Sequence, residues 1–338
     1  MMTLPQCLAL NAAALAQAVA QLGAGQCVGL PTETVYGLAA DAFNADAVLK
    51  IFALKQRPSF DPLIVHVADS TQLAQVVAEV TPLARRLIAT FWPGPLTLLL
   101  PKQPSVPDVV TSGLPQVAVR CPAHPVAQAV LRAFGPLAAP SANRFGRISP
   151  TTALHVAAEF PETDLLILDG GPCNHGVEST IVEPLADGGL NLLRLGSVTT
   201  EALAACVGEG RLRQVDHAEK IRAPGQLKSH YAPRRPLYIV EGGLAALPAI
   251  APQGSMALAF QTLPPGWPGV CLSPTGDLVL AARQIFAALR TLDDGSAAPI
   301  YAEYAPDHGL GRAINDRLWK AATGLAHLTT HGLQHLPK

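Results

Sequence analysis

Short apolar runs alternate with helical patterns along the chain up to residue 214. Apolar residues at helical spacing predict helices, and brief apolar runs bounded by Pro, Gly or Asp predict strands between them. This order indicates an α/β domain with both faces of its sheet partly covered, and leaves parallel and antiparallel pairing open. The predicted strands are Cys27–Leu30, Leu63–Val67, Leu96–Leu100, Val117–Val119, Leu165–Leu168 and Thr180–Val182. The predicted helices are Asn11–Leu22, Ala45–Leu54, Leu73–Val80, Leu83–Phe91, Val126–Phe134 and Thr152–Ala158.

The pattern changes at residue 215. Residues 215–236 are polar, contain prolines and lack apolar periodicity, which is typical of a linker. We therefore expect a larger domain over residues 1–214, an interdomain linker over 215–236, and a smaller α/β domain over 237–338. In the last part the predicted strands are Leu237–Val240, Met256–Phe260 and Pro299–Ala302, and the predicted helices are Leu278–Leu292 and Arg312–Ala322.

The charge composition narrows the ligand class. Lys plus Arg number 24 against 25 Asp plus Glu, which leaves a formal charge of -1. Proteins that bind nucleic acid mainly by counterion release carry a basic excess, so a small anion fits better than a polyanion. The first cation is Lys50, and no uncharged apolar run reaches the roughly 20 residues of a membrane span. We expect a cytoplasmic protein.

The cysteines do not form a metal or disulfide pattern. There are six, scattered without a Cys-x-x-Cys pair. Cys121 and His124 have ligand-like spacing, yet a structural zinc site needs two further ligands. The sequence therefore predicts no protein-bound structural metal.

Polar groups follow the first predicted strand directly. In Leu30–Leu38, Pro31 ends the strand and Gly37 permits a tight backbone, with two threonines, a glutamate and a tyrosine between them. These side chains could meet a ligand. The alternative is an ordinary connection to a helix with Thr34 as its N-cap.

Two cations stand where a predicted helix ends. Lys55 and Arg57 precede Pro58 and could hold phosphate oxygens. Alternatively they are helix-end cations, worth about 0.3 to 1 kcal/mol. Asp61 and His66 then fall at opposite ends of a buried apolar segment, where a core histidine is the usual alternative.

Further polar residues follow later strands. Arg120 ends an apolar strand, so its permanent charge needs an anionic partner, for which we favour a ligand over a distant salt bridge. Ser141 and Asn143 follow small residues and could donate to phosphate or purine, and Ser149 could instead cap a helix. Gly170–Thr180 is glycine-rich, but no Walker A or Gly-x-Gly-x-x-Gly motif is present.

Together these segments resemble, in order, the threonylcarbamoyl-AMP synthase family with its YrdC-like catalytic domain. The resemblance implies a twisted mixed sheet flanked by helices, plus a smaller Rossmann-like C-terminal domain of the long, two-domain form. The catalytic motifs are Pro31–Leu38, Lys55-x-Arg57-Pro58, Pro62–His66, Ser141–Asn143, Ser149–Thr151 and Gly176–Thr180, and those of the long form are His230–Pro233 and Gly309–Leu318.

The family joins L-threonine, bicarbonate or CO2, and ATP into threonylcarbamoyl-AMP and pyrophosphate. Its product supplies the group later placed on the tRNA adenosine beside the anticodon, which implies a downstream transfer enzyme and only weak or indirect tRNA binding. Mg2+ is expected on the ATP phosphates, with no protein ligands. Such chemistry needs positioning and charge neutralisation rather than a protein nucleophile.

The resemblance also assigns residues to roles. The catalytic cations would be Lys55 and Arg57. Residues that would hold L-threonine are Thr34, His66, Arg120, Ala139 and Ser179. Residues that would contact ATP are Arg57, Asp61, Gln116, Ser141, Ser149, Arg194 and Tyr231. The chain departs from the family pattern at Gln116 (usually threonine), Phe145 (commonly serine) and Ile148 (commonly proline).

Two other functions share this fold. One is a double-stranded-RNA-binding module, which the net charge disfavours. The other is carbamoyl transfer, whose known carriers of this fold have additional acylphosphatase-like and zinc-finger domains with cysteine pairs that are missing here.

Overall fold

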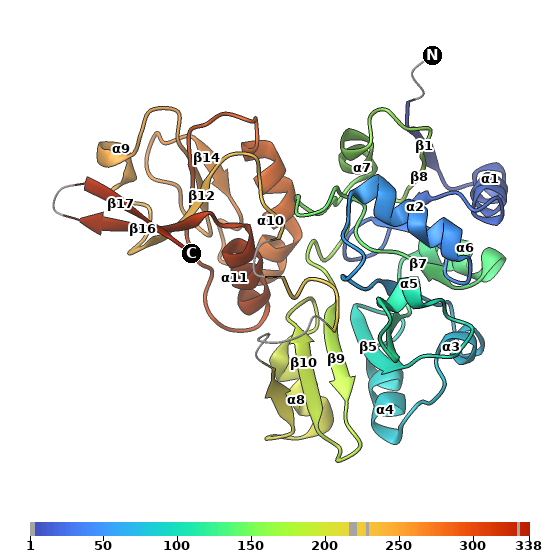
Figure 1. The fold of residues 1–338 in the computed structure, drawn as a ribbon. Helices are drawn as coiled ribbons and strands as arrows, with labels where there is room; N and C mark the ends of the chain where they lie inside the picture. Colours follow the sequence, from blue (N-terminus) through green and yellow to red (C-terminus); the bar gives the residue numbers. More distant parts are fainter. Residues whose placement is uncertain (1–3, 216–221, 228–229, 330–331) are drawn as a thin grey trace. The chain divides into compact units, whose positions relative to one another are not determined.

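The computed structural model describes residues 4–215, 222–227, 230–329 and 332–338. The chain forms two compact units, one of Met1–Phe145 with Ser149–Gln226 and one of Gly146–Ile148 with Leu227–Lys338 (Figure 1). Parts of the predicted linker, residues 216–221 and 228–229, lie outside the described residues.

The first unit is built on an eleven-stranded sheet of order β1-β8-β2-β3-β7-β4-β6-β5-β9-β10-β11. The sheet contains parallel pairs, such as β4 with β6, and antiparallel pairs, such as β5 with β6, so the predicted mixed sheet is confirmed. Its strands are β1 (Gln6–Ala9), β2 (Val28–Leu30), β3 (Gly37–Asp41), β4 (Ile64–His66), β5 (Leu96–Pro101), β6 (Gln116–Arg120), β7 (Leu137–Ala138), β8 (Leu166–Asp169), β9 (Thr180–Pro184), β10 (Leu190–Arg194) and β11 (Leu212–Gln214).

Helices cover this sheet in two apolar cores. Helices α1 and α6 pack against each other and against β2 and β8, and the other helices contribute to a larger core (Figure 1). The helices of the unit are α1 (Ala12–Gly23), α2 (Ala45–Lys55), α3 (Ser70–Val76), α4 (Pro82–Phe91), α5 (Asp108–Thr111), α6 (Pro125–Phe134), α7 (Ala153–Glu159) and α8 (Thr200–Val207).

Helix α3 begins and ends earlier than predicted, at Ser70 and Val76 rather than at Leu73 and Val80. The reason is its N-cap. The carboxylate of Asp69 accepts hydrogen bonds from the amides at positions 71 and 72, at 2.9 and 3.0 Å, which fixes the first turn there.

The central strands have two apolar faces, because side chains alternate along a strand. Val65 and Val119 point into the larger, helix-covered core. Ile64 and Ala118 point the other way and join a separate cluster that contains Ala223, from the predicted linker, and no residue of a helix. Among the described residues, linker and strand side chains alone form this cluster.

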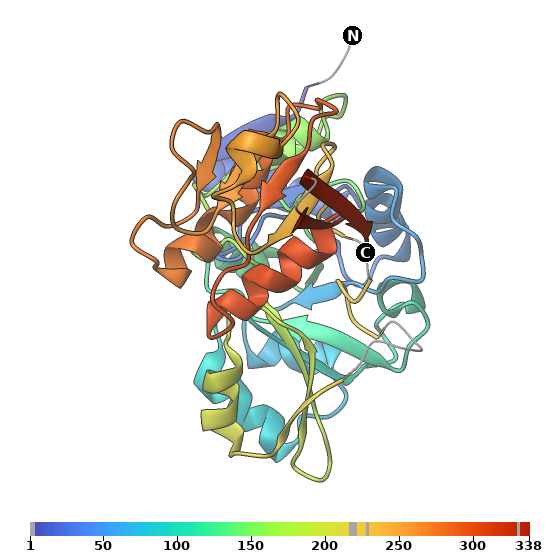
Figure 2. The same ribbon diagram turned by 90° about the vertical axis from the view of Figure 1, so that its left-hand side faces the viewer.

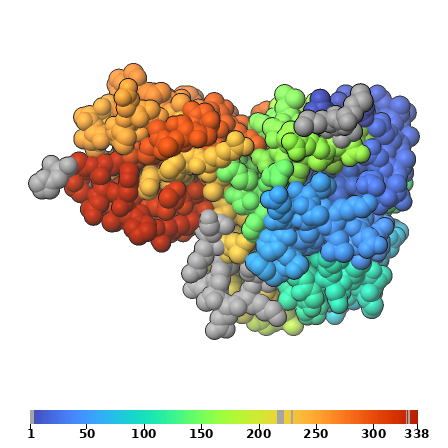
Figure 3. All heavy atoms as spheres, turned by 45° about the horizontal axis from the view of Figure 1, so that its top comes forward, coloured from blue at the N-terminus to red at the C-terminus, as the bar shows by residue number. Residues whose placement is uncertain are grey.

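The second unit carries a six-stranded sheet of order β14-β13-β15-β12-β16-β17, parallel except for the β16–β17 pair. The predicted second α/β domain is confirmed. Figure 3 shows the gold spheres around β12 between orange and red spheres of the same unit, in line with β12 pairing with β15 and β16. Helices α10 and α11 pack against each other (Figure 2). The elements are β12 (Leu237–Glu241), α9 (Leu247–Ile250), β13 (Met256–Ala259), β14 (Gly269–Cys271), α10 (Leu278–Leu292), β15 (Ile300–Ala302), α11 (Leu310–Ala321), β16 (Gly324–Thr329) and β17 (Gly332–Pro337).

Candidate functional site

Side chains alternate along a strand, and this alternation places several polar groups on one face of the central strands. It is the face that carries the apolar cluster with Ala223. The register pairs Ile64 with Ala118 and His66 with Arg120. Both polar residues therefore lie side by side, on the same face as the two apolar ones. Gln116, two residues before Ala118, shares this face. The face thus has an apolar floor with polar groups at each end.

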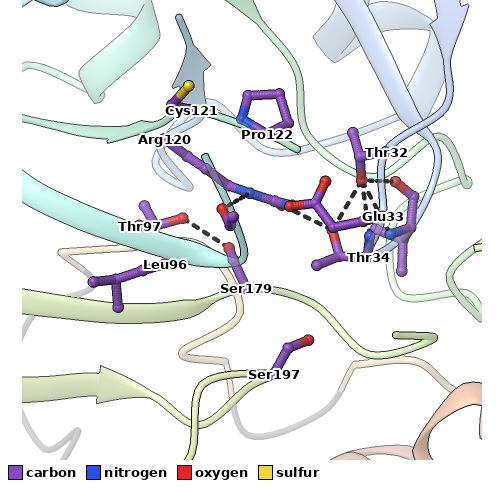
Figure 4. Close-up of polar contacts among 12 residues, drawn as sticks. Thr32, Glu33, Thr34, Leu96, Thr97, Arg120, Cys121, Pro122, Ser179 and Ser197 are labelled. Carbon is purple, nitrogen blue, oxygen red and sulfur yellow. Dashed lines mark hydrogen bonds and ion pairs between the residues drawn. The ribbon is translucent and has the colours of Figure 1, made fainter. Parts of the chain in front are cut away.

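Arg120 is fixed by three contacts at one end of this face (Figure 4). Its Nε donates to the carbonyl of Gly94 at 3.1 Å and its Nη1 to the hydroxyl of Thr34 at 2.8 Å. Its Nη2 lies 2.6 Å from a carboxylate oxygen of Glu33, and the two side chains are 3% and 7% exposed. The anionic partner in this structure is Glu33, so the distant salt bridge that the sequence analysis ranked below a ligand is present. Arg120 also contacts Thr34.

Glu33 keeps its negative charge in this buried place. Burial alone would raise its pKa, but the charge and hydrogen bond of Arg120 and backbone amides outweigh burial and lower the pKa below its ordinary value. The site therefore presents a fixed positive and a fixed negative group next to each other. A zwitterion such as an amino acid carries the same two charges.

His66 is a neutral acceptor beside Arg120. Burial, followed by the positive charge of Arg120, lowers the pKa of His66 to about 3. Its Nδ1 is buried and has no hydrogen-bond partner among the described residues. Ala139, whose amide donates to the carbonyl of Ile64 at 2.9 Å, lies next to the same strand. Its small side chain joins the smaller apolar core.

The lowered pKa of His66 predicts an acid-sensitive fold. Unfolded histidine protonates near pH 6.5 but folded His66 only near 3, so the unfolded state binds more protons between these values. The contribution of His66 to the free energy of unfolding is fully present above pH 6.5 and decreases as the pH drops toward 3. We expect the urea midpoint to fall between about pH 7 and about pH 5, and to fall less in a His66→Gln variant. An equal decrease in both proteins would contradict a neutral His66.

Ser179 connects the predicted threonine and nucleotide residues. Its hydroxyl lies 2.7 Å from that of Thr97 and accepts from Nη2 of Arg194 at 3.0 Å. The same Nη2 also donates to the Ser179 carbonyl at 2.9 Å. Thr97 is fully buried and faces Ser179 (Figure 4). Sequence reasoning missed Thr97, although a lone polar residue in the run Leu96–Leu100 was a signal for it.

A Thr97→Val variant tests this connection, because valine keeps the shape and removes the hydroxyl. One neutral hydrogen bond is worth about 0.5–1.5 kcal/mol. For L-threonine, the substrate that the sequence resemblance implies, we therefore expect the KM to rise about 3- to 10-fold. Steady-state kinetics at saturating ATP measures it. An unchanged KM would show that Thr97 does not orient Ser179.

Lys55 is buried at the end of α2 and points toward the Ser141–Asn143 segment. Its Nζ lies 2.5 Å from the carbonyl oxygens of Ser141 and of Asn143. Burial, and then the charge of Arg57, lower the pKa of Lys55 well below its ordinary value. The ammonium thus shapes the backbone of the predicted nucleotide-binding segment.

The side chain of Arg57 bonds to two residues of the loop that follows it, Asp61 and Pro62. Its Nη2 lies 2.9 Å from the carboxylate of Asp61, and it donates to the carbonyls of Asp61 and Pro62 at 3.1 and 2.8 Å. Asp61 is fully buried, and burial raises its pKa although Arg57 counteracts this. The structure therefore brings these two predicted ATP-contacting residues together.

The Pro31–Leu38 segment is tied to both serine-bearing loops. The amide of Leu38 donates to the carbonyl of Pro140 at 2.8 Å, beside Ser141, and that of Tyr36 donates to the carbonyl of Pro150 at 2.9 Å, beside Ser149. The hydroxyl of Ser149 donates to the carboxylate of Glu178 at 2.6 Å. Segments far apart in the sequence thus meet around one site.

Two further predicted ATP-contacting residues, Gln116 and Tyr231, have other partners. The carboxamide of Gln116, at the other end of the face, bonds to Glu183 and Arg222. Tyr231 belongs to the second unit, where it is 1% exposed, has a φ of 66° and packs 5.5 Å from the ring of Phe286.

Metal-ligating side chains do not cluster in the described part of the chain: no group of three or more His, Cys, Asp or Glu is placed to hold an ion. None of the described helices is long and apolar enough to cross a membrane.

Two family models match the chain. The model described as "Telomere recombination" matches residues 20–196, and the one described as "Threonylcarbamoyl-AMP synthase, C-terminal domain" matches residues 198–323. Curated relatives named threonylcarbamoyl-AMP synthase include one from Bacillus subtilis, 42% identical over 94% of this chain and 95% of its own length. Another, from Pyrococcus abyssi, is 39% identical over 88% of this chain and 91% of its own length.

Solved structures agree with these relatives. The crystal structure of P. abyssi Sua5 complexed with L-threonine matches with a TM-score of 0.85 at 35% identity, covering 95% of this chain and 98% of that one. A double-alanine variant of the same protein matches with a TM-score of 0.84 at 34% identity, covering 98% of this chain and 100% of that one. The motifs, the mixed sheet and these matches over both units show that the chain belongs to the threonylcarbamoyl-AMP synthase family, in its two-domain form.

Proposed function

We propose that this protein makes L-threonylcarbamoyladenylate from L-threonine, bicarbonate or CO2, and ATP, with release of pyrophosphate. One observation carries the proposal: Arg120, Thr34, Glu33 and neutral His66 meet at one end of a sheet face, in a chain whose P. abyssi relative was crystallised with L-threonine. A buried pair of opposite charges beside a hydroxyl and an uncharged imidazole suits a small polar zwitterion.

In the threonine subsite, Arg120 would bind the carboxylate and Glu33 would face the amino group. Thr34, His66 and Ser179 offer hydroxyl and imidazole partners for the substrate hydroxyl, and Ala139 leaves space. The amine must lose its proton before it reacts. The amine then forms a C–N bond with CO2, loses a second proton to water and yields the carbamate anion.

In the transfer step a carbamate oxygen attacks the α-phosphorus of ATP, and the bond from that phosphorus to the bridging oxygen breaks. Pyrophosphate leaves with that oxygen. Protein groups need only align two anions and offset their charge, for which we propose Lys55 and Arg57 as the catalytic cations. In the structure they bond to Ser141–Asn143 and to Asp61, so rearranging or shaping these segments would be part of their role.

The nucleotide would contact Arg57, Asp61, Ser141, Ser149, Arg194 and Tyr231, with Gln116 at the far end of the face. Magnesium held by the ATP phosphates would offset part of their charge.

We also propose a division of labour along the chain. Residues 1–214 would form the catalytic domain, residues 215–236 a lid, and residues 237–338 the C-terminal domain.

The lid would carry Tyr231 to the nucleotide and exclude water from the carbamate and the adenylate. Wild-type turnover and ATP affinity in a Tyr231→Ala protein would contradict this role. The product would pass in the cytoplasm to an enzyme that transfers the group to tRNA.

The proposed reaction is tested by incubating the protein with L-threonine, ATP, Mg2+ and 13C-bicarbonate and analysing the products by mass spectrometry. The expected product is threonylcarbamoyl-AMP that carries one labelled carbon. Unlabelled AMP alone would indicate hydrolysis. RNA retention with steep salt dependence and no such product would favour the RNA-binding alternative.

A further inference from the structure

Gln116, Glu183 and Arg222 form a hydrogen-bonded triangle, which we call the latch. Nη2 of Arg222 donates to Oε1 of Gln116 at 2.8 Å and to Oε1 of Glu183, and Nε2 of Gln116 donates to Oε1 of Glu183 at 3.0 Å. Asn191 from β10 donates to the other oxygen of Glu183 at 2.9 Å. Two strand residues thus hold one residue of the predicted linker.

Glu183 is suited to hold a cation. Burial opposes its charge, but hydrogen bonds from Arg222, Asn191 and Gln116 outweigh burial and lower its pKa below the ordinary value. Its side chain is 8% exposed, against 35% for that of Arg222. Removing one partner of a largely desolvated pair is costly, because the other charge stays behind.

The latch fixes a turn that is itself ordered. The carboxamide oxygen of Gln226 accepts from the amides of Arg222 and Ala223, at 2.7 and 3.1 Å. Ala223 is fully buried in the apolar cluster of the sheet face. Nη1 of Arg194 donates to the carbonyl of Pro224 at 3.2 Å. Arg222–Gln226 is therefore held at one end by the latch, in the middle by apolar burial, and beyond it by Arg194.

We infer that the latch holds the start of the linker on the substrate-binding face, and that Gln116 is a positioning residue for the linker. The inference rests on the proposed function. The carboxamide of Gln116 both accepts from Arg222 and donates to Glu183. A threonine hydroxyl on its shorter side chain would not reach both.

Limited trypsin digestion of the full-length protein tests the latch without relying on activity. Trypsin cleaves after Arg222 only when this side chain and its neighbours leave the sheet. In Glu183→Gln and in Gln116→Thr we expect cleavage of the 222–223 bond, followed by mass spectrometry, to be about fivefold faster or more than in wild type. Wild-type cleavage rates in both variants would overturn the inference.

Asp187→Asn is the matched control. Asp187 also pairs with an arginine, Arg213, near the β9–β10 turn, but both side chains are more than half exposed, at 55% and 53%. We expect its 222–223 cleavage rate to equal that of wild type. Faster cleavage in this control as well would show a general loosening of the hairpin and overturn the latch.

Kinetics distinguishes positioning from a purely structural effect. If the latch places the linker over the nucleotide, Glu183→Gln should raise the KM for ATP about 5- to 10-fold and change the KM for L-threonine less than about twofold. Equal changes in both would contradict positioning. A wild-type protein without threonine-dependent turnover would refute the proposed function, whereas the cleavage rates would still decide whether the latch exists.

Discussion

An Arg120→Met variant is expected to lose about three orders of magnitude in kcat/KM for L-threonine. Hydrogen bonds to charged groups contribute about 1.5–3 kcal/mol each, and the guanidinium would supply two of them to a carboxylate. Arg120 also orients Thr34 at 2.8 Å, so its removal disturbs a second substrate contact. Initial rates over a range of L-threonine concentrations at saturating ATP measure the loss.

A loss of folding stability must be distinguished from a loss of substrate binding in this experiment. Removing Arg120 leaves Glu33 buried without its ion-pair partner, which costs about 3–5 kcal/mol. The double variant Arg120→Met with Glu33→Gln removes both charges. We expect it to recover much of the thermal stability and none of the activity. Recovery of activity together with stability would mean that Arg120 only neutralises Glu33 and does not bind substrate.

A Lys55→Met variant is expected to lower kcat/KM for ATP by about two orders of magnitude. The ammonium joins the carbonyls of Ser141 and Asn143, and an unsatisfied buried carbonyl costs about 1–3 kcal/mol. Without it the segment that carries predicted nucleotide contacts loses its shape. Steady-state kinetics in ATP, with thermal unfolding in parallel, measures both effects.

Lys50→Met is the matched control for Lys55. Lys50 also lies on α2, and its Nζ donates to the carbonyl of Gly25 at 2.8 Å, in a part of the unit that carries none of the predicted site residues. We expect a modest loss of stability and unchanged kinetics. Similar kinetic losses in both variants would mean that Lys55 matters only for folding. Because Lys55 and Arg57 are both buried and bonded, replacing the two together should also destabilise the first unit.

Strands with branched and leucine side chains could be predicted, whereas those that depend on tertiary context could not. Leu96–Leu100 and Thr180–Val182 fall within β5 and β9, and α10 has the predicted bounds Leu278–Leu292. The strand β3 was missed because its sequence, Gly-Leu-Ala-Ala-Asp, has low strand propensity, and pairing with β2 and β7 stabilises it. Neighbouring strands rather than local sequence define it.

In the site, too, some features could be predicted from local sequence and others depend on tertiary contacts. Period-two alternation explains why His66 and Arg120 share a face once their strands pair in register. Nothing local to Arg120 shows that Glu33 is its partner, because the pairing depends on the tertiary fold. The latch could not be predicted either, because Arg222 lies in a segment without apolar periodicity and its partner Glu183 is distant in the sequence.

The most direct test of the proposed reaction is pyrophosphate release by the purified protein with ATP and Mg2+, omitting L-threonine or bicarbonate in turn. We expect release only when both are present. Release that continues without L-threonine, or no release from folded protein under any combination, would contradict it.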